Sequence, residues 1–484
     1  MSGRWLSCQC RPAFRPLDHH GRRSYAPGNT PPQRRAPTET PCPLTRTAAA
    51  VAPVQSRFSR FMPSLRFPRL RRALLLLVTV LSGSFLFWMS RSTVIQTAGG
   101  VYHSILIPVG RGAIRWRADL ARVAATPHLS QLHGPIISTG STGATAAWFC
   151  GDSVARAPLQ QNRLEIECLG RRSRVSLRTD AEVVFPTVLP GTERIAVVSD
   201  LEGDVAYLRG WLRAVGVTDS AAAWTYGNGR LVVLGDFMDR GRTVYDLLWF
   251  LYELEGKARA AGGDVHLVLG NHEQYGFAGN IKDVEAEHLY AIEQIEPYES
   301  ALSDTTVLGR WLRAKPIVLR IGDLLFAHGG ISSAILDAPQ DLDAINREHR
   351  ELLAGQIVDD TVRSRLTGVM APTQYRGYRM ATDAYPLAPQ ALIDRVRTQY
   401  GVRYIVVGHT EQDSLFATHG GAVFDVNTTL TSRQALTFIG QQPVIVDAVP
   451  ARVPFAEPAP VTRRFSVFRA SDWAAFLRVF TVAF

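Results

Sequence analysis

The chain has 484 residues, of which 46% are hydrophobic and 20% charged, so it is long and apolar enough for a substantial core and more than one domain. Its formal net charge is +10, but residues 1–72 hold 14 Arg, no Lys and two acidic residues, which leaves the other 412 residues at about −2. The basic charge belongs to an N-terminal leader. Because no cluster of basic and aromatic residues occurs outside it, we expect no nucleic-acid binding by the folded part.

The N-terminal region predicts a leader followed by a membrane anchor. Residues 1–61 are rich in Arg and Pro and lack hydrophobic periodicity, which predicts a disordered basic leader, with a transit peptide as the alternative. The uncharged run ALLLLVTVLSGSFLFWM at 73–89 follows five Arg within 60–72 and precedes only Arg91 closely. We therefore predict an uncleaved signal-anchor over 62–91, with the remainder outside the cytoplasm, periplasmic in a bacterium. A buried core helix is disfavoured because the run lacks a polar face.

The flanking segments carry less information. Short alternating stretches such as RLEIECL, separated by turn residues, predict a small β-rich accessory segment over 92–190, whose role the sequence does not reveal. Cys150 and Cys168 lie in this segment, where an oxidising compartment would permit a disulfide; two buried thiols are the equal alternative. Residues 448–484 are predicted to be a Pro-rich linker and a C-terminal tail.

From residue 191 the pattern changes to apolar runs of five or six residues that alternate with helical patterns. The runs are IAVVSD at 195–200, LVVLGD at 231–236, VHLVLGN at 265–271, LLFAHG at 324–329 and YIVVGH at 404–409. Continuous apolar strands linked by helices predict an α/β domain over 191–447, with a largely parallel or mixed sheet that is covered on both faces.

Each of these five predicted strands ends in a side chain that can bind a metal ion. The residues are Asp200, Asp236, Asn271, His328 and His409. Loops at the carboxyl ends of strands assemble the active sites of such sheets. A single Gly-Asp or Gly-His pair is an ordinary turn signal, but turns do not require His, so five successive strand ends of this kind favour a shared metal site.

The strings around these residues resemble those of the calcineurin-like metallophosphoesterase superfamily. They are SDLEGD at 199–204, GDFMDRG at 235–241, GNHE at 270–273, HGG at 328–330 and GHT at 408–410. The second and third point to the phosphoprotein-phosphatase branch, and GRWLRAKPIVLRIGDLLFAHGGIS at 309–332 with QYRGYR at 374–379 resembles the Shewanella-like protein phosphatases. The resemblance covers about 191–440. It implies an α/β fold with a metallophosphoesterase-type β-sandwich flanked by helices, next to the small N-terminal β-rich segment and the single membrane anchor.

The resemblance also implies two divalent metal ions and a bridging hydroxide as the attacking group. Asp236 would bridge the ions and Asp200 would bind the first, while Asn271, His328 and His409 would complete the second. Mixed oxygen and imidazole ligands suit manganese, iron or zinc better than calcium, and we expect manganese.

One position departs from the family pattern. Most members have Asp-x-His-Gly where this chain has Asp200-Leu201-Glu202-Gly203. We expect Glu202 to replace the imidazole as a ligand of the first metal, which favours Mn²⁺, Fe²⁺ or Mg²⁺ over Zn²⁺ there. The alternative is that Glu202 points away and that the first site is weak or empty.

The charge that develops during phosphoester hydrolysis suggests roles for further residues. The departing oxygen needs a proton, for which His272 is the candidate acid, with Asp239 holding its imidazole. Arg240 and Arg376, together with Asn271, are the candidates for binding the phosphate, because a guanidinium can hold two phosphoryl oxygens at once. Arg379 is near enough to substitute for Arg376. A structural Asp239–Arg240 ion pair and a core His272 are the alternatives, and Glu273 and His419 receive no role.

The sequence thus predicts metal-dependent hydrolysis of phosphate monoesters, chiefly as a phosphoprotein phosphatase acting on Ser, Thr or Tyr. A hydrolase of nucleotides or dinucleoside polyphosphates is one alternative, because fold analogy does not choose a substrate. A degenerate, membrane-tethered phosphate-binding module is the other. The expected partners are a phosphorylated protein or a small phosphate ester, and the membrane through residues 73–89; the sequence does not predict an oligomeric state.

Overall fold

The computed structural model describes residues 68–96, 102–109, 112–119, 131–141, 143–151, 153–179, 184, 186–338, 340–454, 461–470, 472–473 and 476–477. The predicted leader over residues 1–61 lies outside these residues.

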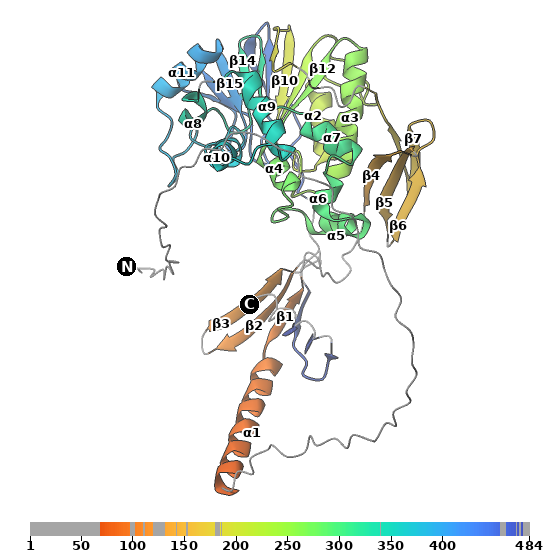
Figure 1. Cartoon of the computed structure of the whole chain (residues 1–484), viewed down its shortest axis with the longest axis vertical. Coiled ribbons are helices and arrows are strands. Elements are labelled where there is room, and N and C mark those ends of the chain that lie inside the picture. Colours follow the sequence, from red (N-terminus) through yellow and green to blue (C-terminus); the bar gives the residue numbers. More distant parts are fainter. Residues whose placement is uncertain are drawn as a thin grey trace, which may run out of the picture. The chain divides into compact units, whose positions relative to one another are not determined.

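Two mixed sheets form the centre of the domain that begins near residue 187 (Figure 1). The first has the order β12 (Asp264–Val268), β11 (Arg230–Leu234), β10 (Arg194–Val198), β18 (Ala435–Ile439), β19 (Gln442–Val446). The second has the order β16 (Ala417–Thr418), β17 (Val423–Asp425), β15 (Tyr404–Val407), β14 (Leu324–Ala327), β13 (Val318–Ile321), β9 (Val188–Leu189). Strands β10, β11 and β12 run parallel, as do β14, β15 and β17.

The two sheets pack face to face, and their outer faces meet helices. Strand β10 illustrates this arrangement, because its side chains point alternately to opposite faces. Ile195 and Val197 join a core built from strands of both sheets, with Phe326 and Val406 from the other sheet. Ala196 belongs instead to the larger core that the helices form. The apolar runs were therefore correctly predicted to be buried on both faces. The two packed sheets agree with the β-sandwich flanked by helices that the family resemblance implies. The apolar runs by themselves predicted only one mixed sheet, since an apolar run does not reveal whether a helix or a second sheet covers it.

The helices follow the predicted periodicity. Their bounds are α2 (Val205–Ala214), α3 (Val244–Ala260), α4 (Asn271–Phe277), α5 (Ala286–Ile295), α6 (Tyr298–Ala301), α7 (Val307–Arg313), α8 (Ser333–Leu336), α9 (Leu342–Leu353), α10 (Asp360–Thr367) and α11 (Gln390–Tyr400). Helix α2 begins after Asp204, whose carboxylate accepts the Tyr207 N–H at 2.9 Å and so satisfies a free donor of the first turn. It buries Leu208, Trp211 and Leu212, which confirms its predicted apolar face.

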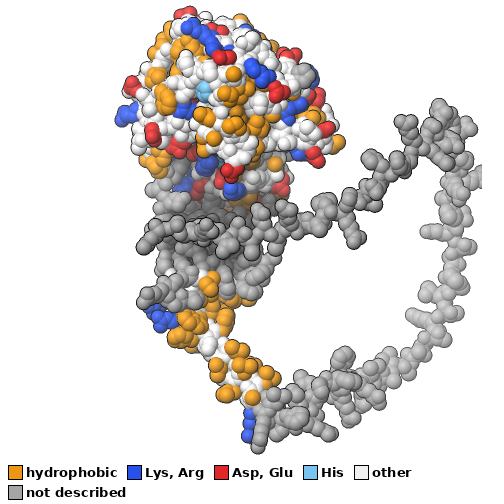
Figure 2. All heavy atoms as spheres, turned by 90° about the vertical axis from the view of Figure 1, so that its left-hand side faces the viewer, with side chains coloured by type: hydrophobic (Ala, Val, Ile, Leu, Met, Phe, Trp, Pro, Cys, Tyr) orange, Lys and Arg blue, Asp and Glu red, His pale blue; other side chains and the backbone are white. Residues whose placement is uncertain are grey.

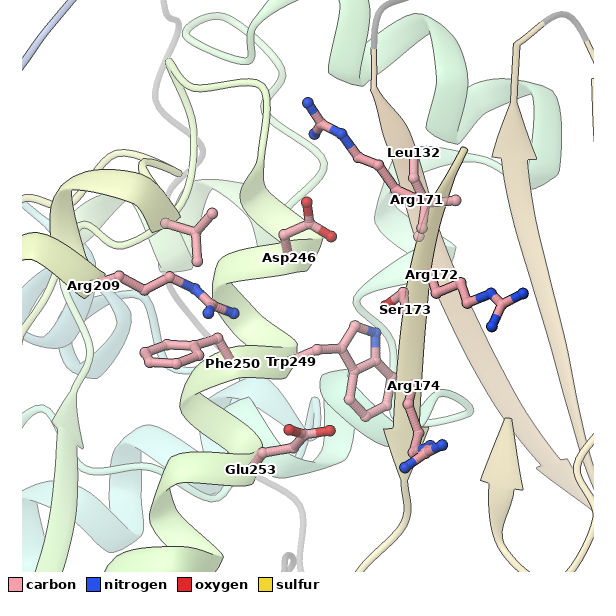
Figure 3. A pocket seen from close by; sticks show the side chains of 12 residues that line it. Leu132, Arg171, Arg172, Ser173, Arg174, Arg209, Asp246, Trp249, Phe250 and Glu253 are labelled. Atoms are coloured by element: carbon pink, nitrogen blue, oxygen red, sulfur yellow. The ribbon is translucent and has the colours of Figure 1, made fainter. Parts of the chain in front are cut away.

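An accessory β segment packs against the helices of the first sheet. It consists of β4 (Leu132–Gly140), β5 (Gly143–Cys150), β6 (Ser153–Pro158) and the hairpin β7 (Arg163–Cys168) with β8 (Arg171–Ser176). A disulfide joins Cys150 to Cys168, with Cα atoms 5.8 Å apart, so the disulfide alternative holds. Trp249 of α3 donates its indole N–H to the carbonyl of Pro135 in β4 at 2.9 Å. Figure 3 shows Trp249, Asp246 and Glu253 of α3 along the side of a cavity whose other wall is β8.

A further sheet combines strands from both ends of the described chain. Its order is β20 (Val461–Arg464), β1 (Thr93–Gln96), β2 (Tyr102–Val109), β3 (Gly112–Asp119). Strand β20 comes from the predicted tail, which contains no strand pattern long enough to be recognised. Before β1 runs helix α1 (Pro68–Ser90), whose stretch Arg72–Ser90 has a mean hydropathy of 2.0 and is long enough to cross a membrane. Its Leu and Val side chains from Leu74 to Leu81 are 52–68% exposed (Figure 2), unlike those of a core helix.

Candidate metal centre and active site

The five predicted ligand residues lie in loops at one end of the two sheets. Asp200 and Asp236 follow β10 and β11, and Asn271 begins α4 after β12. His328 and His409 follow β14 and β15 of the facing sheet. The two sheets therefore present their loops to a common space, as predicted from the strand ends.

The loops turn sharply at these residues. Among the described residues, twelve other than glycine have a positive φ, and six of these are predicted site residues. The six are Asp200, Glu202, Asp236, Asp239, Arg240 and His409, with φ between 49° and 69°. The left-handed conformation is unfavourable for residues with a Cβ and persists where the surrounding structure imposes it, often at functional sites.

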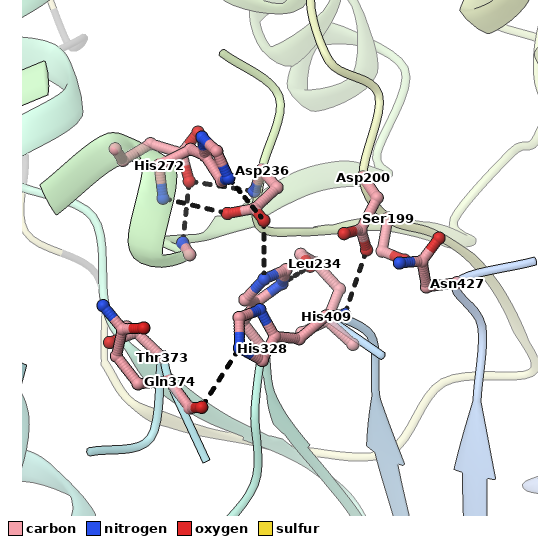
Figure 4. A network of polar contacts seen from close by, with 12 residues as sticks. Ser199, Asp200, Leu234, Asp236, His272, His328, Thr373, Gln374, His409 and Asn427 are labelled. Atoms are coloured by element: carbon pink, nitrogen blue, oxygen red, sulfur yellow. Dashed lines mark hydrogen bonds and ion pairs between the residues drawn. The ribbon is translucent and has the colours of Figure 1, made fainter. Parts of the chain in front are cut away.

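Three of the ligand candidates converge. One side-chain donor atom each from Asp236, His328 and His409 lies within 4.8 Å of the other two. The closest pair is His328 Nε2 and Asp236 Oδ2, 3.0 Å apart (Figure 4). All three side chains are buried, and Asp236 and His409 also line a cavity, so a carboxylate and two imidazoles face one another at the bottom of an open site.

One nitrogen of each imidazole already has a backbone carbonyl as its hydrogen-bond partner. His328 donates its Nδ1–H to the Leu234 carbonyl at 2.7 Å, and His409 donates its Nε2–H to the Gln374 carbonyl at 3.0 Å (Figure 4). In the neutral form of each ring, the other nitrogen carries a lone pair that faces the cluster. Such backbone partners fix the tautomer and the ring orientation of metal-binding histidines.

Two buried atoms test whether a metal ion fits here. Asn271 Oδ1 is buried and has no hydrogen-bond partner among the described residues, and the buried His328 Nε2 faces only the Asp236 carboxylate, 3.0 Å away. Buried polar atoms normally have partners, so the Asn271 oxygen indicates a missing ligand. Both atoms can supply a lone pair, and His328 Nε2 faces the Asp236 carboxylate, as a divalent cation requires. The residues therefore fit a metal centre.

The first-metal candidates differ in their surroundings. Asp200 is buried and accepts the backbone N–H of His409 at 3.1 Å, which ties the loops of the two sheets together. Burial raises the pKa of Asp200 to about 6, and an adjacent cation would lower it again. Glu202 is partly exposed and its carboxylate forms an ion pair with Arg240. The structure thus brings Asp200 to the cluster and places Glu202 at its rim.

His272 and Asp239 form a buried pair beside the cluster. His272 Nδ1 lies 2.8 Å from Asp239 Oδ2, and its backbone N–H is donated to Asp236 Oδ1 at 3.0 Å. Burial disfavours the charged imidazole, but the hydrogen bond to Asp239 and the charge of Asp236 outweigh burial and raise the pKa of His272. Arg240 Nη2 lies 3.0 Å from His272 Nε2, and the guanidinium also meets Glu202, so Arg240 contacts His272 instead of forming the alternative ion pair with Asp239.

The structure separates Arg376 from Arg379. Arg376 lines a cavity of about 410 Å³ together with Asp200, Asp236 and His272, and its guanidinium donates to the His409 carbonyl. Arg379 does not line this cavity; it contacts Gln412 and Asp425 and packs on the Phe416 ring at 4.5 Å. Of the two, only Arg376 therefore faces the cavity that Asp200, Asp236 and His272 line.

Two residues outside the predicted set also shape the site. Glu273 is fully buried and accepts the backbone N–H groups of Asp236, Phe237, Met238 and Gly270 at 2.7–3.2 Å, so it holds the loop that carries Asp236. Its position three residues after Gly270, as in a capping box, was the signal in the sequence that could have identified Glu273.

Arg452 lines the same cavity as Arg376 and stacks on Tyr207 at 4.6 Å. It lies in the predicted linker, where no signal marked it. His419 forms hydrogen bonds with Thr418 and with the Ala388 carbonyl and does not line this cavity.

Comparison with known proteins agrees with the motifs. Residues 193–413 match the family model described as calcineurin-like phosphoesterase. Shewanella-like protein phosphatase 2 of Arabidopsis thaliana is 26% identical over 282 residues, which is 48% of this chain and 69% of that protein. Shewanella-like protein phosphatase 1 of Plasmodium berghei is 26% identical over 230 residues, 46% of this chain and 62% of that protein. The crystal structure of a cold-active protein-tyrosine phosphatase from a psychrophilic Shewanella species superposes with a TM-score of 0.60 at 29% identity, covering 65% of this chain and 97% of that one.

Proposed function

Because residues 193–413 form a calcineurin-like phosphoesterase domain, which makes the chain a hydrolase of phosphate esters, we propose that it removes phosphate from phosphorylated proteins at a two-metal centre. The observation that carries the proposal is the convergence of Asp236, His328 and His409 within 4.8 Å, beside the hydrogen-bonded His272–Asp239 pair. A site that only bound phosphate would not need an acid placed next to its metal ligands.

We assign the metal ligands as the motifs predict. Asp236 is shared between two sites, Asp200 and Glu202 belong to the first, and Asn271, His328 and His409 belong to the second. When bound, two divalent cations, for which we propose Mn²⁺, lower the pKa of the attacking water and offset the charge on the phosphoryl oxygens. Support comes from the unpartnered Asn271 Oδ1, from the close approach of His328 Nε2 to Asp236, and from the backbone carbonyls that orient both imidazoles.

His272 is proposed to protonate the leaving group. As water adds to phosphorus, the bond from phosphorus to the ester oxygen breaks, and the proton on His272 Nε2 passes to that oxygen. Asp239 holds the opposite nitrogen at 2.8 Å, which fixes the ring and favours its protonated form. The raised pKa of His272 supports this role, because the acid must carry its proton at neutral pH.

Arg240 and Arg376 are proposed to bind the phosphoryl oxygens together with Asn271. Arg240 cannot keep its contact with His272 once Nε2 is protonated, because both atoms would then be donors. We therefore infer that Arg240 turns to the phosphate when substrate binds. Its ion pair with Glu202 limits how far it can move.

The choice of a protein substrate rests on the relatives. Those named above are called protein phosphatases, and one solved structure is of a protein-tyrosine phosphatase. The test is hydrolysis of p-nitrophenyl phosphate by the full chain with and without Mn²⁺, followed by a panel of phosphoserine, phosphothreonine and phosphotyrosine peptides and of nucleotides. We expect metal-dependent turnover, a preference for phosphopeptides, and, for His272→Asn, a loss of at least about 100-fold in kcat on the phosphoserine and phosphothreonine peptides, whose leaving oxygen needs a proton. A preference for nucleotides would overturn the substrate class. No metal-dependent turnover would favour the binding module.

Helix α1 is proposed to anchor the protein in a membrane, with the phosphatase domain outside the cytoplasm. The exposed apolar side chains of α1, the Arg residues before it and the Cys150–Cys168 disulfide support this location. A reporter fused after residue 484 should be active only outside the cytoplasm; activity only inside would reverse the orientation.

A further inference from the structure

A buried group of aromatic side chains lies beside the proposed acid pair, next to Asp239. Tyr298 begins α6 and is 1% exposed. Its hydroxyl is 3.5 Å from Asp239 Oδ1, the oxygen that does not contact His272. Burial and the Asp239 charge raise the pKa of Tyr298 well above 10, so the hydroxyl keeps its proton and donates to the carboxylate.

His288 of α5 holds the Tyr298 ring in place. The two rings are perpendicular, with centroids 6.1 Å apart, and His288 is fully buried. Tyr245 packs on the same imidazole at 5.7 Å, but its hydroxyl donates to the Ala301 carbonyl instead. The two tyrosines therefore share one environment and differ in whether they reach Asp239.

The accessory segment supports this group. His133 of β4 packs against His288, with ring centroids 5.6 Å apart, and its Nε2 lies 3.2 Å from the Glu287 carboxylate. Glu287 also pairs with Arg242, two residues after Arg240, at 3.5 Å. Strand β4 is thus linked in two ways to the loop that carries Asp239 and Arg240. One link runs through Glu287 to Arg242, and the other runs through His288 and Tyr298 to Asp239. A disulfide-bonded segment behind a catalytic loop can keep that loop in one position.

We propose that Tyr298 is a positioning residue for the Asp239–His272 pair and that the accessory segment, through His133 and His288, keeps Tyr298 in place. The inference rests on the acid role proposed for His272. By fixing the second oxygen of Asp239, Tyr298 orients the carboxylate toward His272 Nδ1 and the imidazole toward the leaving oxygen. The 3.5 Å separation is long for a hydrogen bond, so we expect a moderate effect on rate.

The test compares Tyr298→Phe with Tyr245→Phe in the full chain, on phenyl phosphate and on p-nitrophenyl phosphate. Phenolate is a strong base and needs its proton during bond cleavage, whereas p-nitrophenolate leaves readily without it. We expect Tyr298→Phe to lower kcat on phenyl phosphate about three- to tenfold, with less than about twofold change on p-nitrophenyl phosphate and KM unchanged. Tyr245→Phe should leave both rates within about twofold. Equal losses on the two substrates, or equal effects of the two variants, would overturn the proposal.

A second pair of variants tests the accessory segment. His133→Leu removes the ring beneath His288 and should reproduce the leaving-group difference, whereas Trp249→Phe breaks only the bond from α3 to Pro135 in the same strand and should not. If both variants act alike, the segment has no link to the acid pair. His272→Asn separates this proposal from the one on which it rests. If His272→Asn leaves phenyl phosphate turnover intact, the acid role is wrong; if it abolishes turnover while Tyr298→Phe behaves like Tyr245→Phe, only the positioning role is wrong.

Discussion

Removing the charge of Glu255 is expected to cost about 3 kcal/mol of unfolding free energy. Glu255 is 1% exposed on α3 and accepts from Arg178, Arg259, Trp311 and Lys315 at 2.6–2.7 Å. Burial opposes its ionisation, but the positive charges of Lys315, Arg259 and Arg178 outweigh burial and lower the pKa of Glu255 from 4.5 to about 2. A shift of about 2.5 pH units corresponds to about 3 kcal/mol. Burial also lowers the pKa of Lys315, so Glu255 offsets the penalty of a buried cation and its loss leaves that cation uncompensated.

The assay is urea unfolding of Glu255→Gln and the parent between pH 7 and pH 2.5. Because the folded pKa is below the unfolded one, the stabilisation is fully present above about pH 4.5 and is lost as the pH falls toward about 2. The two proteins should therefore differ by about 3 kcal/mol at pH 7 and converge in acid. A difference below about 1 kcal/mol at pH 7, or one that does not shrink in acid, would refute the reasoning.

Three further outcomes follow from the same geometry. Glu202→Ala should lose one equivalent of bound metal by elemental analysis; an unchanged count would leave Glu202 as the partner of Arg240 alone. Arg376→Ala should raise KM for a phosphopeptide about tenfold or more, whereas Arg379→Ala, which contacts Asp425, should lower the melting temperature and leave KM within about twofold; equal KM values would contradict the assignment. Burial lowers the pKa of His349 to about 3 in the folded protein, so the unfolded chain takes up a proton first and the fold loses stability as the pH falls below about 6.5. In urea unfolding, the parent should therefore lose about 2 kcal/mol more unfolding free energy between pH 7 and pH 5 than His349→Gln does.

Much of the site was predictable because its residues follow strands. Asp200, Asp236 and His328 each end an apolar run, and the carboxyl ends of parallel strands meet at one edge. Asn271 and His409 obey the same rule, so local pattern was enough to place all five. The pairing of His272 with Asp239 could also be proposed, because His272 directly follows Asn271 and Asp239 lies three residues after Asp236.

Other features depend on contacts that no local pattern records. Glu273 and Arg452 act on loops brought to them by folding, and Tyr298 meets Asp239 across 59 residues. Strand β20 was missed because four residues do not establish a period, and its partner β1 is more than 360 residues away. The second sheet was predicted only from the family resemblance, because a helix and a second sheet bury the same apolar side chains of a strand.

The number of metal ions bound per chain tests the central claim most directly, when it is measured on the parent and on Asp236→Asn after equilibration with Mn²⁺. We predict two ions per parent chain and a loss of bound metal in Asp236→Asn, because this carboxylate is proposed to bind both ions. Fewer than two ions in the parent, or the same content in both proteins, would contradict a shared two-metal centre.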